Sequence, residues 1–209
     1  MFTIINYGVG NLGSISNMLA YLDIEHRVSA APKDVLEAER LLLPGVGSFD
    51  FGMTKLNESG LTDVLQQRVC VDKVPVMGIC LGMQIMCQFS EEGQVPGLGW
   101  FDAKVKKFDL ERMDKDRPIP HTGWNDVRFI HAHPVSSGLP LDARFYFVHG
   151  YHVECDHPKD EWMQADYGYP FTAALASENK LAVQFHPEKS HKFGLTLLKN
   201  FAGWSYAPS

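Results

Sequence analysis

In the first half of the chain, short apolar runs alternate with segments whose apolar residues recur every three or four positions. The continuous runs predict buried β-strands, and the three-to-four spacing predicts helices with one buried face. We expect strands at 2–6, 25–29, 40–44 and 74–79, and helices at 14–22, 32–39, 61–69 and 81–89. Strands separated by helices of this length pair in a parallel sheet with helices on both faces.

The second half consists mainly of alternating or aromatic-rich runs that are broken by Gly, Pro and Asp. Such runs predict antiparallel strands and hairpins. They lie at 100–108, 124–130, 143–154, 162–168 and 171–177, before a strand at 180–185 and a closing helix at 192–204. We therefore predict an α/β fold whose central sheet is mixed and mostly parallel, flanked by helices, with an antiparallel elaboration in the second half. Because no linker or repeat interrupts the pattern, we expect one domain over residues 1–209.

Composition excludes several classes of function. The 209 residues carry a net charge of −6, and their Lys and Arg residues are scattered, so no basic surface favours nucleic acid. No apolar run approaches the ~18–20 residues of a membrane span, and the N-terminus does not resemble a signal peptide. The four cysteines form no C-x-x-C pair and are expected to be reduced thiols. These features indicate a cytoplasmic protein with no nucleic-acid or membrane partner.

A glycine-rich loop follows the first strand. Gly8, Gly10 and Gly13 have the G-x-G-x-x-G spacing of a dinucleotide-binding turn. Such a site also needs an acidic residue at the end of the second strand, where this chain has Ser29 and alanines. We therefore interpret the loop as a turn at the carboxyl edge of the sheet, and we expect no cofactor.

The stretch "VMGICLGMQ" contains the strongest chemical signal. Cys80 lies between a predicted strand and a predicted helix, with Gly78 and Gly82 two residues to either side. This pattern is typical of a nucleophile elbow, a tight turn that presents a reactive side chain at the edge of the sheet. The backbone N–H of Leu81 could then donate to an oxyanion. Cys87, later in the same predicted helix, is expected to pack in the core.

The stretch "QFHPEKS" supplies partners for such a cysteine. His186 and Glu188 follow an apolar strand, and their i, i+2 spacing lets both side chains face the same way. Glu188 could fix the imidazole tautomer while His186 exchanges a proton with Cys80, which makes a Cys-His-Glu triad. In "LLLPGVGSF" a strand breaks into glycines, so the backbone of Gly47 could complete an oxyanion hole.

Three motifs, "PGVGSF", "GICLGMQ" and "QFHPEKS", in this order, resemble those of the class I (triad-type) glutamine amidotransferases. The chain is similar from end to end to one group of them, the HisH family of glutaminase subunits of imidazole glycerol phosphate synthase. The narrower resemblance rests on "YGVGN", "SEEG", "PHTGWN", "FYFVHGY" and "LLKNF".

The resemblance implies that L-glutamine is hydrolysed to glutamate and ammonia through a thioester on Cys80. Ammonia would then pass to a (β/α)8-barrel cyclase (HisF-like) subunit in a heterodimer, which makes imidazole glycerol phosphate and AICAR in histidine biosynthesis. By the same resemblance, glutamine binds to Gln84, Glu92 and the backbone of His149, Gly150 and Tyr151. The positions that match the synthase interface are Asn11, Trp124, Asn125, Tyr146 and Lys189.

Two alternatives concern function. Members of the family usually have Asp at the position of Asn6, commonly Met at the position of Thr122 and often Ser at the position of Gly150. These departures leave open the alternative that the chain supplies ammonia to a paralogous barrel synthase, which uses it to amidinate a surface-polysaccharide sugar. An inactive binding module is the other alternative, and the intact triad argues against it.

A metal site is a third alternative, because histidines gather after the aromatic strand. The candidates are His149, His152, Cys155 and His157, with His131 and His133. His149 and His152 would point to opposite faces of one continuous strand, and no zinc-type spacing is present. We therefore interpret them as surface histidines on a hairpin and expect no metal.

Overall fold

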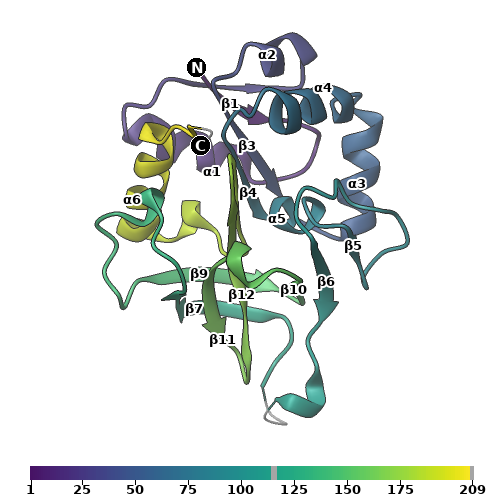
Figure 1. Ribbon diagram of the computed structural model, residues 1–209, viewed down its shortest axis with the longest axis vertical. Coiled ribbons are helices and arrows are strands. Elements are labelled where there is room, and N and C mark those ends of the chain that lie inside the picture. Colours follow the sequence, from purple (N-terminus) through teal and green to yellow (C-terminus); the bar gives the residue numbers. More distant parts are fainter. Residues whose placement is uncertain (114–116, 208–209) are drawn as a thin grey trace.

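The computed structural model describes residues 1–113 and 117–207, and a central β-sheet organises them (Figure 1). The first part of this sheet is parallel, with the strand order β2-β1-β3-β4-β13. These strands are β1 (Phe2–Ile5), β2 (His26–Ser29), β3 (Arg40–Gly45), β4 (Val76–Cys80) and β13 (Lys180–Val183). Their carboxyl ends therefore meet at one edge, where loops can assemble a site.

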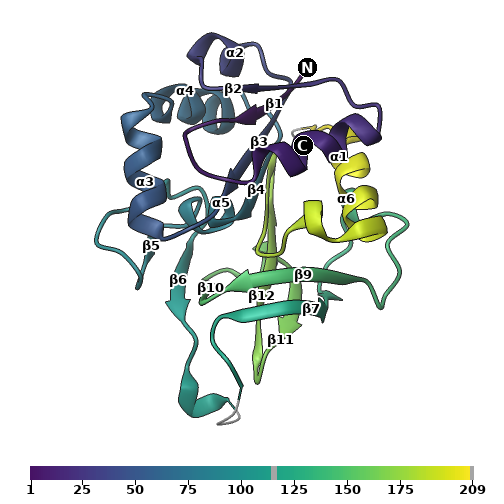
Figure 2. The same cartoon turned by 180° about the vertical axis from the view of Figure 1, so that it is seen from behind.

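Helices cover both faces of the parallel part (Figures 1 and 2). One face is covered by α1 (Leu12–Tyr21) and α6 (His191–Gly203). The other is covered by α2 (Pro32–Leu36), α3 (Phe49–Glu58), α4 (Thr62–Gln66), a π-helical turn (Gln67–Val71) and α5 (Leu81–Ile85). Successive strand residues enter different cores: Ile4 packs with α1 and α6, and Ile5 packs with α2 to α5. The unbroken apolar strands of the sequence are thus buried on both sides.

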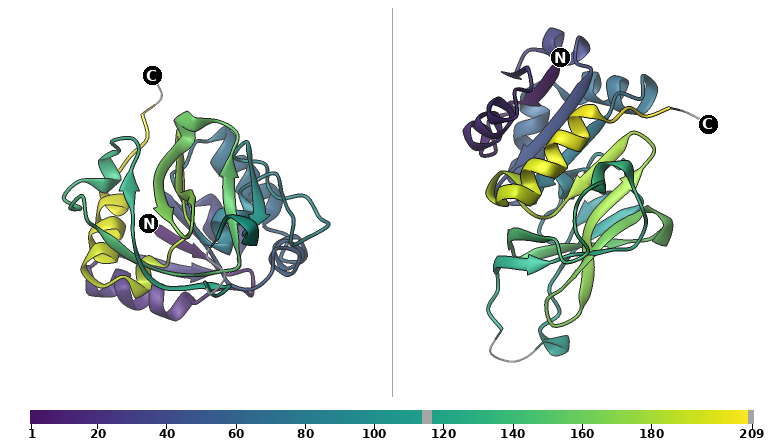
Figure 3. Two further views of the ribbon diagram at one scale, coloured as in Figure 1. Left: turned by 90° about the horizontal axis from the view of Figure 1, so that it is seen from below. Right: turned by 90° about the vertical axis from the view of Figure 1, so that its left-hand side faces the viewer.

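The second part of the sheet is largely antiparallel and extends away from the helices (Figure 3). From β13 it continues through β12 (Pro170–Ser177), β10 (Tyr151–Cys155), β6 (Ala103–Lys107) and β5 (Phe89–Ser90). A side branch consists of β11 (Glu161–Asp166), which pairs with β12 and with β8 (Arg128–Phe129). A separate antiparallel ribbon of β7 (His121–Asp126) and β9 (Arg144–His149) runs crosswise to β11 and β12 (Figure 2).

Short 3-10 turns lie at Leu110–Arg112, Pro134–Ser136, Pro158–Asp160 and Pro187–Lys189. Among residues 1–113 and 117–207, no helix combines the length and the apolar composition that a membrane crossing requires.

The predicted fold class is confirmed, but several boundaries were wrong. The expected helix 81–89 ends at Ile85, because a loop donates backbone hydrogen bonds to the carbonyls that would continue it: Leu98 to Ile85 and Trp100 to Met86. The expected strand 143–154 divides at Gly150 into β9 and β10, which belong to different sheets. Helix α3 was not predicted, although Phe49, Met53 and Leu56 have helical spacing and are buried.

Candidate active site

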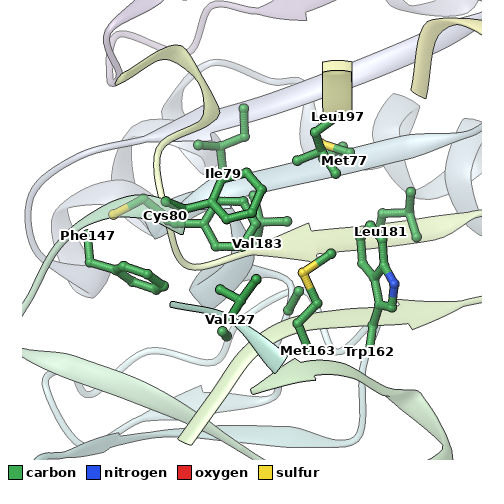
Figure 4. Packing of buried hydrophobic residues seen from close by; sticks show 14 of the residues in the cluster. Met77, Ile79, Cys80, Val127, Phe147, Trp162, Met163, Leu181, Val183 and Leu197 are labelled. Atoms are coloured by element: carbon green, nitrogen blue, oxygen red, sulfur yellow. The ribbon is translucent and has the colours of Figure 1, made fainter. Parts of the chain in front are cut away.

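Cys80 lies at a strained turn between β4 and α5. Its φ of 55° and ψ of −110° are unusual for a residue with a side chain, which indicates a backbone held by its surroundings. A Cβ at Gly82 would collide with the carbonyl of Leu43, and one at Gly78 would collide with Met86. The two glycines thus let β3, β4 and α5 approach closely enough to hold the turn. Figure 4 places Cys80 at the margin of the core cluster, with its sulfur directed away from the packed side chains.

His186 and Glu188 form a buried pair at the start of a 3-10 turn. His186 Nδ1 lies 2.8 Å from Glu188 Oε1, and the two side chains are 2% and 1% exposed. Glu188 therefore fixes the imidazole orientation and leaves Nε2 for Cys80. Burial alone would lower the pKa of His186, but interactions with Cys80 and Glu188 outweigh it and raise the pKa to about 9.

Ser190 anchors this turn to β9. Its Oγ donates to the carbonyl of His186 at 2.6 Å and accepts from the N–H of Tyr146 at 3.0 Å. The N–H of His186 also donates to the carbonyl of Tyr146 at 2.8 Å. Sequence reasoning assigned no role to Ser190, because its partner strand lies more than 40 residues earlier in the chain.

A cleft of about 190 Å³ joins the elbow to this turn. It brings together Cys80, His186 and the seven residues predicted for the oxyanion hole and for glutamine. Its lining is Val46, Gly47, Cys80, Leu81, Gln84, Glu92, Val148, His149, Gly150, Tyr151 and His186. Glu188 does not line the cleft and lies behind His186. A larger cleft, of about 490 Å³, is lined by residues of the antiparallel part and includes neither Cys nor His.

Polar side chains in the cleft are held by the protein itself. Glu92 accepts from the N–H of Phe49, the first residue of α3, at 2.8 Å. The amide Nε2 of Gln84 donates to the carbonyl of Tyr151 at 3.2 Å and to Oε1 of Gln184 at 3.0 Å. Both amide hydrogens of Gln84 are thereby used within the protein, so its Oε1 is the polar atom left for a ligand.

Gln184 is a residue whose role the sequence analysis missed. It is fully buried, and its Nε2 lies 3.8 Å from the sulfur of Cys80 while its Oε1 accepts from Gln84. One side chain thus connects the candidate nucleophile with a candidate substrate ligand. The available signal was a polar residue inside the apolar strand "KLAVQF".

The glycine-rich loop after β1 packs against the end of β3, which leads into the loop that contains Gly47. Tyr7 is buried and its hydroxyl donates to the carbonyl of Pro44 at 2.8 Å. Burial, with a smaller contribution from Cys80, raises the pKa of Tyr7, so it remains a neutral donor. Gly10, with φ of +117°, lies against the ring of Pro44. The loop thus supports the edge of the cleft.

The residues predicted for the synthase interface fall into two groups. Trp124 and Tyr146 pair across β7 and β9 with ring centroids 6.4 Å apart, and Lys189 Nζ lies 5.5 Å from the Tyr146 ring. Asn125 is adjacent, but its amide is bonded inward, to His121 and to the carbonyl of Asp166. Asn11 alone makes up the second group, at the N-terminal end of α1.

The interpretation of His149 and His152 as surface histidines was wrong. They are 6% and 7% exposed, and both rings pack against Phe108. Because the chain changes sheets at Gly150, the alternation of one continuous strand does not apply to them. His157 is exposed and contacts Asp102 at 3.0 Å. Within the described ranges, no group of three or more His, Cys, Asp or Glu side chains could hold a metal ion.

Cys87 is buried in the core, as predicted, although it lies beyond the end of α5. Its thiol donates to the carbonyl of Met83 at 3.5 Å, and burial raises its pKa. Cys80 is the cysteine that lines the cleft.

Comparisons with known proteins agree with this geometry. The family model "Glutamine amidotransferase class-I" matches residues 3–203. The chain is 49% identical to "Imidazole glycerol phosphate synthase subunit HisH 2" of Pseudomonas aeruginosa, over 96% of this chain and 98% of that protein. It is 48% identical to the protein of that name from Methanococcus maripaludis, with the same coverage.

Among solved structures, one titled "Crystal structure of glutamine amidotransferase" has the same fold, with a TM-score of 0.73 at 18% identity. The similarity covers 97% of this chain and 99% of that one. The match of the family model over nearly the whole chain, together with close relatives of full length, establishes the family. The chain belongs to the class-I glutamine amidotransferases and, within them, groups with the HisH subunits of imidazole glycerol phosphate synthase.

Proposed function

We propose that this chain is a glutaminase subunit that hydrolyses L-glutamine and supplies ammonia to an imidazole glycerol phosphate synthase. The observation that carries the proposal is the single cleft that joins Cys80 at a strained elbow to the His186–Glu188 pair. A cysteine, a histidine and an orienting carboxylate in this arrangement are the parts needed for acyl transfer.

In the proposed reaction, the sulfur of Cys80 attacks the side-chain carbonyl carbon of glutamine. The raised pKa of His186 keeps the imidazole protonated at neutral pH, and its positive charge stabilises negative charge on the sulfur. His186 then gives its proton to the departing nitrogen, and ammonia leaves a γ-glutamyl thioester. His186 next removes a proton from water, which attacks the thioester. Glutamate leaves as its γ-carboxylic acid, and the thiolate of Cys80 and the protonated His186 are restored.

Charge on the tetrahedral intermediate needs donors, which we assign to the backbone N–H groups of Leu81 and Gly47. Both residues line the cleft, and Gly47 has a φ of +102° that only glycine adopts easily. We assign the amino-acid end of glutamine to Glu92, to Oε1 of Gln84, and to the backbone at His149, Gly150 and Tyr151. A carboxylate in the cleft suits the α-ammonium group.

We further propose that the ammonia is used by a barrel cyclase subunit, which docks on a face containing Trp124, Tyr146, Lys189 and Asn11. The names of the relatives support the histidine pathway over amidination of a sugar. Aromatic residues with a neighbouring cation are frequent anchors of protein interfaces.

The test is synthesis by the complex with the cyclase subunit, fed with either glutamine or ammonium. The wild-type complex is expected to use both, and a complex with Cys80→Ala to use ammonium alone. If Cys80→Ala retained glutamine-dependent synthesis, Cys80 would not be the nucleophile. If no cyclase subunit bound the chain, or if only a sugar synthase used its ammonia, the assignment to histidine biosynthesis would be wrong.

A further inference from the structure

Two buried histidines beside the cleft form hydrogen bonds that neither the triad nor the substrate contacts explain. His149 lines the cleft, and His121 lies behind it on β7. His121 Nδ1 is 3.0 Å from His149 Nε2, and His149 Nδ1 is 2.8 Å from the carbonyl oxygen of Tyr151. The side chains are nearly fully buried, so each ring nitrogen depends on its protein partner.

The partners determine the position of every proton in this group. A carbonyl oxygen only accepts, so His149 carries its hydrogen on Nδ1 and accepts at Nε2. His121 must then donate from Nδ1 and accept at Nε2, where the amide nitrogen of Asn125 lies at 3.3 Å. The Asn125 amide is itself fixed, since it donates to Asp166 O at 2.8 Å and accepts from Asp126 N at 2.9 Å.

Both histidines are neutral at neutral pH, as this arrangement requires. Burial, with a contribution from Arg117, lowers the pKa of His121 to about 4, and burial together with His121 lowers that of His149 to about 3. The His121 ring stacks on Phe147 and Tyr167, with centroids at 4.9 and 4.0 Å. Stacking holds the ring plane but does not select a tautomer, which is left to the hydrogen bonds.

The bond from His149 to Tyr151 matters because it spans Gly150, which lines the cleft. The same Tyr151 carbonyl also accepts from Gln84 at 3.2 Å. In the opposite tautomer, His149 Nδ1 would direct a lone pair at that carbonyl across 2.8 Å. Repulsion between the two acceptors would displace Tyr151 and with it the amide of Gln84.

We propose that His121 is a positioning residue: its Nδ1–H bonds to His149 Nε2 and holds the His149 ring where its own Nδ1–H reaches the Tyr151 carbonyl, which keeps Gln84 in the geometry that receives glutamine. This inference deepens the proposed glutaminase function and rests on it. The tautomer itself can be measured whether or not the chain proves to be a glutaminase.

Two substitutions separate the hydrogen bond from the packing. His121→Phe keeps a stacked ring but removes the donor, and His121→Asn retains an N–H near the position of Nδ1. Imidazole nitrogen-15 NMR of the wild type is expected to show His149 protonated on Nδ1. His121→Phe is expected to leave that proton on Nδ1, because the Tyr151 carbonyl still accepts it, and to move the Nε2 resonance to the downfield position of a nitrogen that accepts no hydrogen bond. His121→Asn is expected to restore the wild-type Nε2 resonance.

Steady-state kinetics of the complex then test the consequence. Loss of one buried hydrogen bond predicts that His121→Phe raises the KM for glutamine about tenfold. Because Cys80 and His186 are untouched, kcat should change less than KM, and alkylation of Cys80 by iodoacetamide should keep its wild-type rate. Cys70 and Cys155, which are partly exposed, serve as internal controls in the same peptide map. His121→Asn should recover most of the wild-type KM.

The inference is overturned if the His149 Nε2 resonance is the same in His121→Phe as in the wild type, or if that resonance changes while KM does not. If His121→Phe does not fold, Asn125→Leu takes its place. This substitution, at a half-buried position of β7, removes the amide that donates to His121 Nε2. It must produce the same changes with smaller magnitude. A wild-type Nε2 resonance of His149 and a wild-type KM in that variant would equally overturn it. Absence of glutaminase activity in the wild type, with the predicted tautomers observed, would instead contradict the proposed function.

Discussion

At the scale of single residues, the cleft depends on side chains that are not themselves reactive. Gln184 lies between Cys80 and Gln84 and hydrogen-bonds to both. Ser190 connects His186 to β9. The candidate reactive groups are therefore held by buried polar partners from other parts of the chain, which restricts them to few conformations.

Gln184→Leu is expected to lower kcat for glutamine hydrolysis by about 10–100-fold, because a hydrogen bond to a charged group contributes about 1.5–3 kcal/mol. The measurement is steady-state kinetics of the complex, with ammonium-dependent synthesis as the control for folding. Asn179→Leu, at another fully buried amide that bonds to Val69 and Val74 and not to the cleft, controls for loss of a buried polar group. A wild-type kcat in Gln184→Leu would show that this side chain only fills space.

The buried histidines also predict how stability depends on pH. The pKa values of His121 and His149 are lowered in the folded state to about 4 and about 3, from an ordinary value of 6.5. Their contribution to stability is therefore complete above pH 6.5 and is lost as the pH falls toward 4. Each proton bound only by the unfolded chain contributes about 1.4 kcal/mol per pH unit.

Urea unfolding measures this dependence between pH 7 and pH 4, the range that contains both the ordinary and the lowered pKa of His121. We expect the free energy of unfolding to fall less steeply with decreasing pH in His121→Phe than in the wild type, because one titrating group is gone. Equal slopes in the two proteins would contradict the assignment of His121 as a neutral buried histidine.

At the scale of elements, the elbow depends on how closely β3, β4 and α5 approach one another. Gly82 lies where a side chain would overlap the carbonyl of Leu43. The substitution Gly82→Ala is expected to reduce the free energy of unfolding by about 3 kcal/mol or more, since backbone must move to admit the methyl group.

Gly13→Ala is the matched control for that prediction. Gly13 lies in α1 with open space around the position of a Cβ, so alanine is expected to stabilise the protein by up to about 1 kcal/mol. Both variants are compared by urea unfolding. Equal stability of Gly82→Ala and the wild type would mean that the elbow does not require this close contact.

The elements also show which features can be predicted from sequence. Apart from the missed α3, apolar periodicity correctly predicted the alternation of strands and helices up to β4, because those elements are buried by neighbours close in the chain. It could not show that a loop from 97 to 101 ends α5, or that Gly150 separates two sheets, since both depend on distant backbone partners.

The same distinction applies to the candidate site. Cys80, His186 and Glu188 were identified because strained turns leave local signatures of glycine and proline. Gln184 and His121 were not, because their partners lie 100 and 28 residues away in the sequence. Local pattern therefore indicated the candidate reactive groups, and the fold was needed to find the residues that contact them.

At the scale of the whole molecule, the crosswise β7–β9 ribbon (Figure 2) carries the aromatic pair Trp124 and Tyr146, and β9 also contributes Val148 and His149 to the lining of the cleft. Trp124 is 39% exposed and contacts both Tyr146 and His191. A large, partly exposed aromatic side chain that is held by neighbours has the character of an interface anchor.

Trp124→Ala is expected to weaken binding of the cyclase subunit by about 2 kcal/mol, or about 30-fold in Kd. Tyr21→Ala is the control, because Tyr21 is more exposed, at 76%, but ends α1 at the opposite edge of the sheet. Titration calorimetry with the purified subunits measures both. If Tyr21→Ala weakened binding and Trp124→Ala did not, the docking face would lie at the other edge.

The central claim is that Cys80 is the nucleophile of a glutamine-hydrolysing triad, and covalent labelling with a diazoketone analogue of glutamine tests it most directly. Loss of glutaminase activity in the complex is compared with the mass of each cysteine peptide. We predict one adduct, on Cys80, that grows in proportion to the lost activity and is prevented by glutamine. An adduct on Cys70, Cys87 or Cys155 that tracks inactivation, or activity that survives complete labelling of Cys80, would contradict the claim.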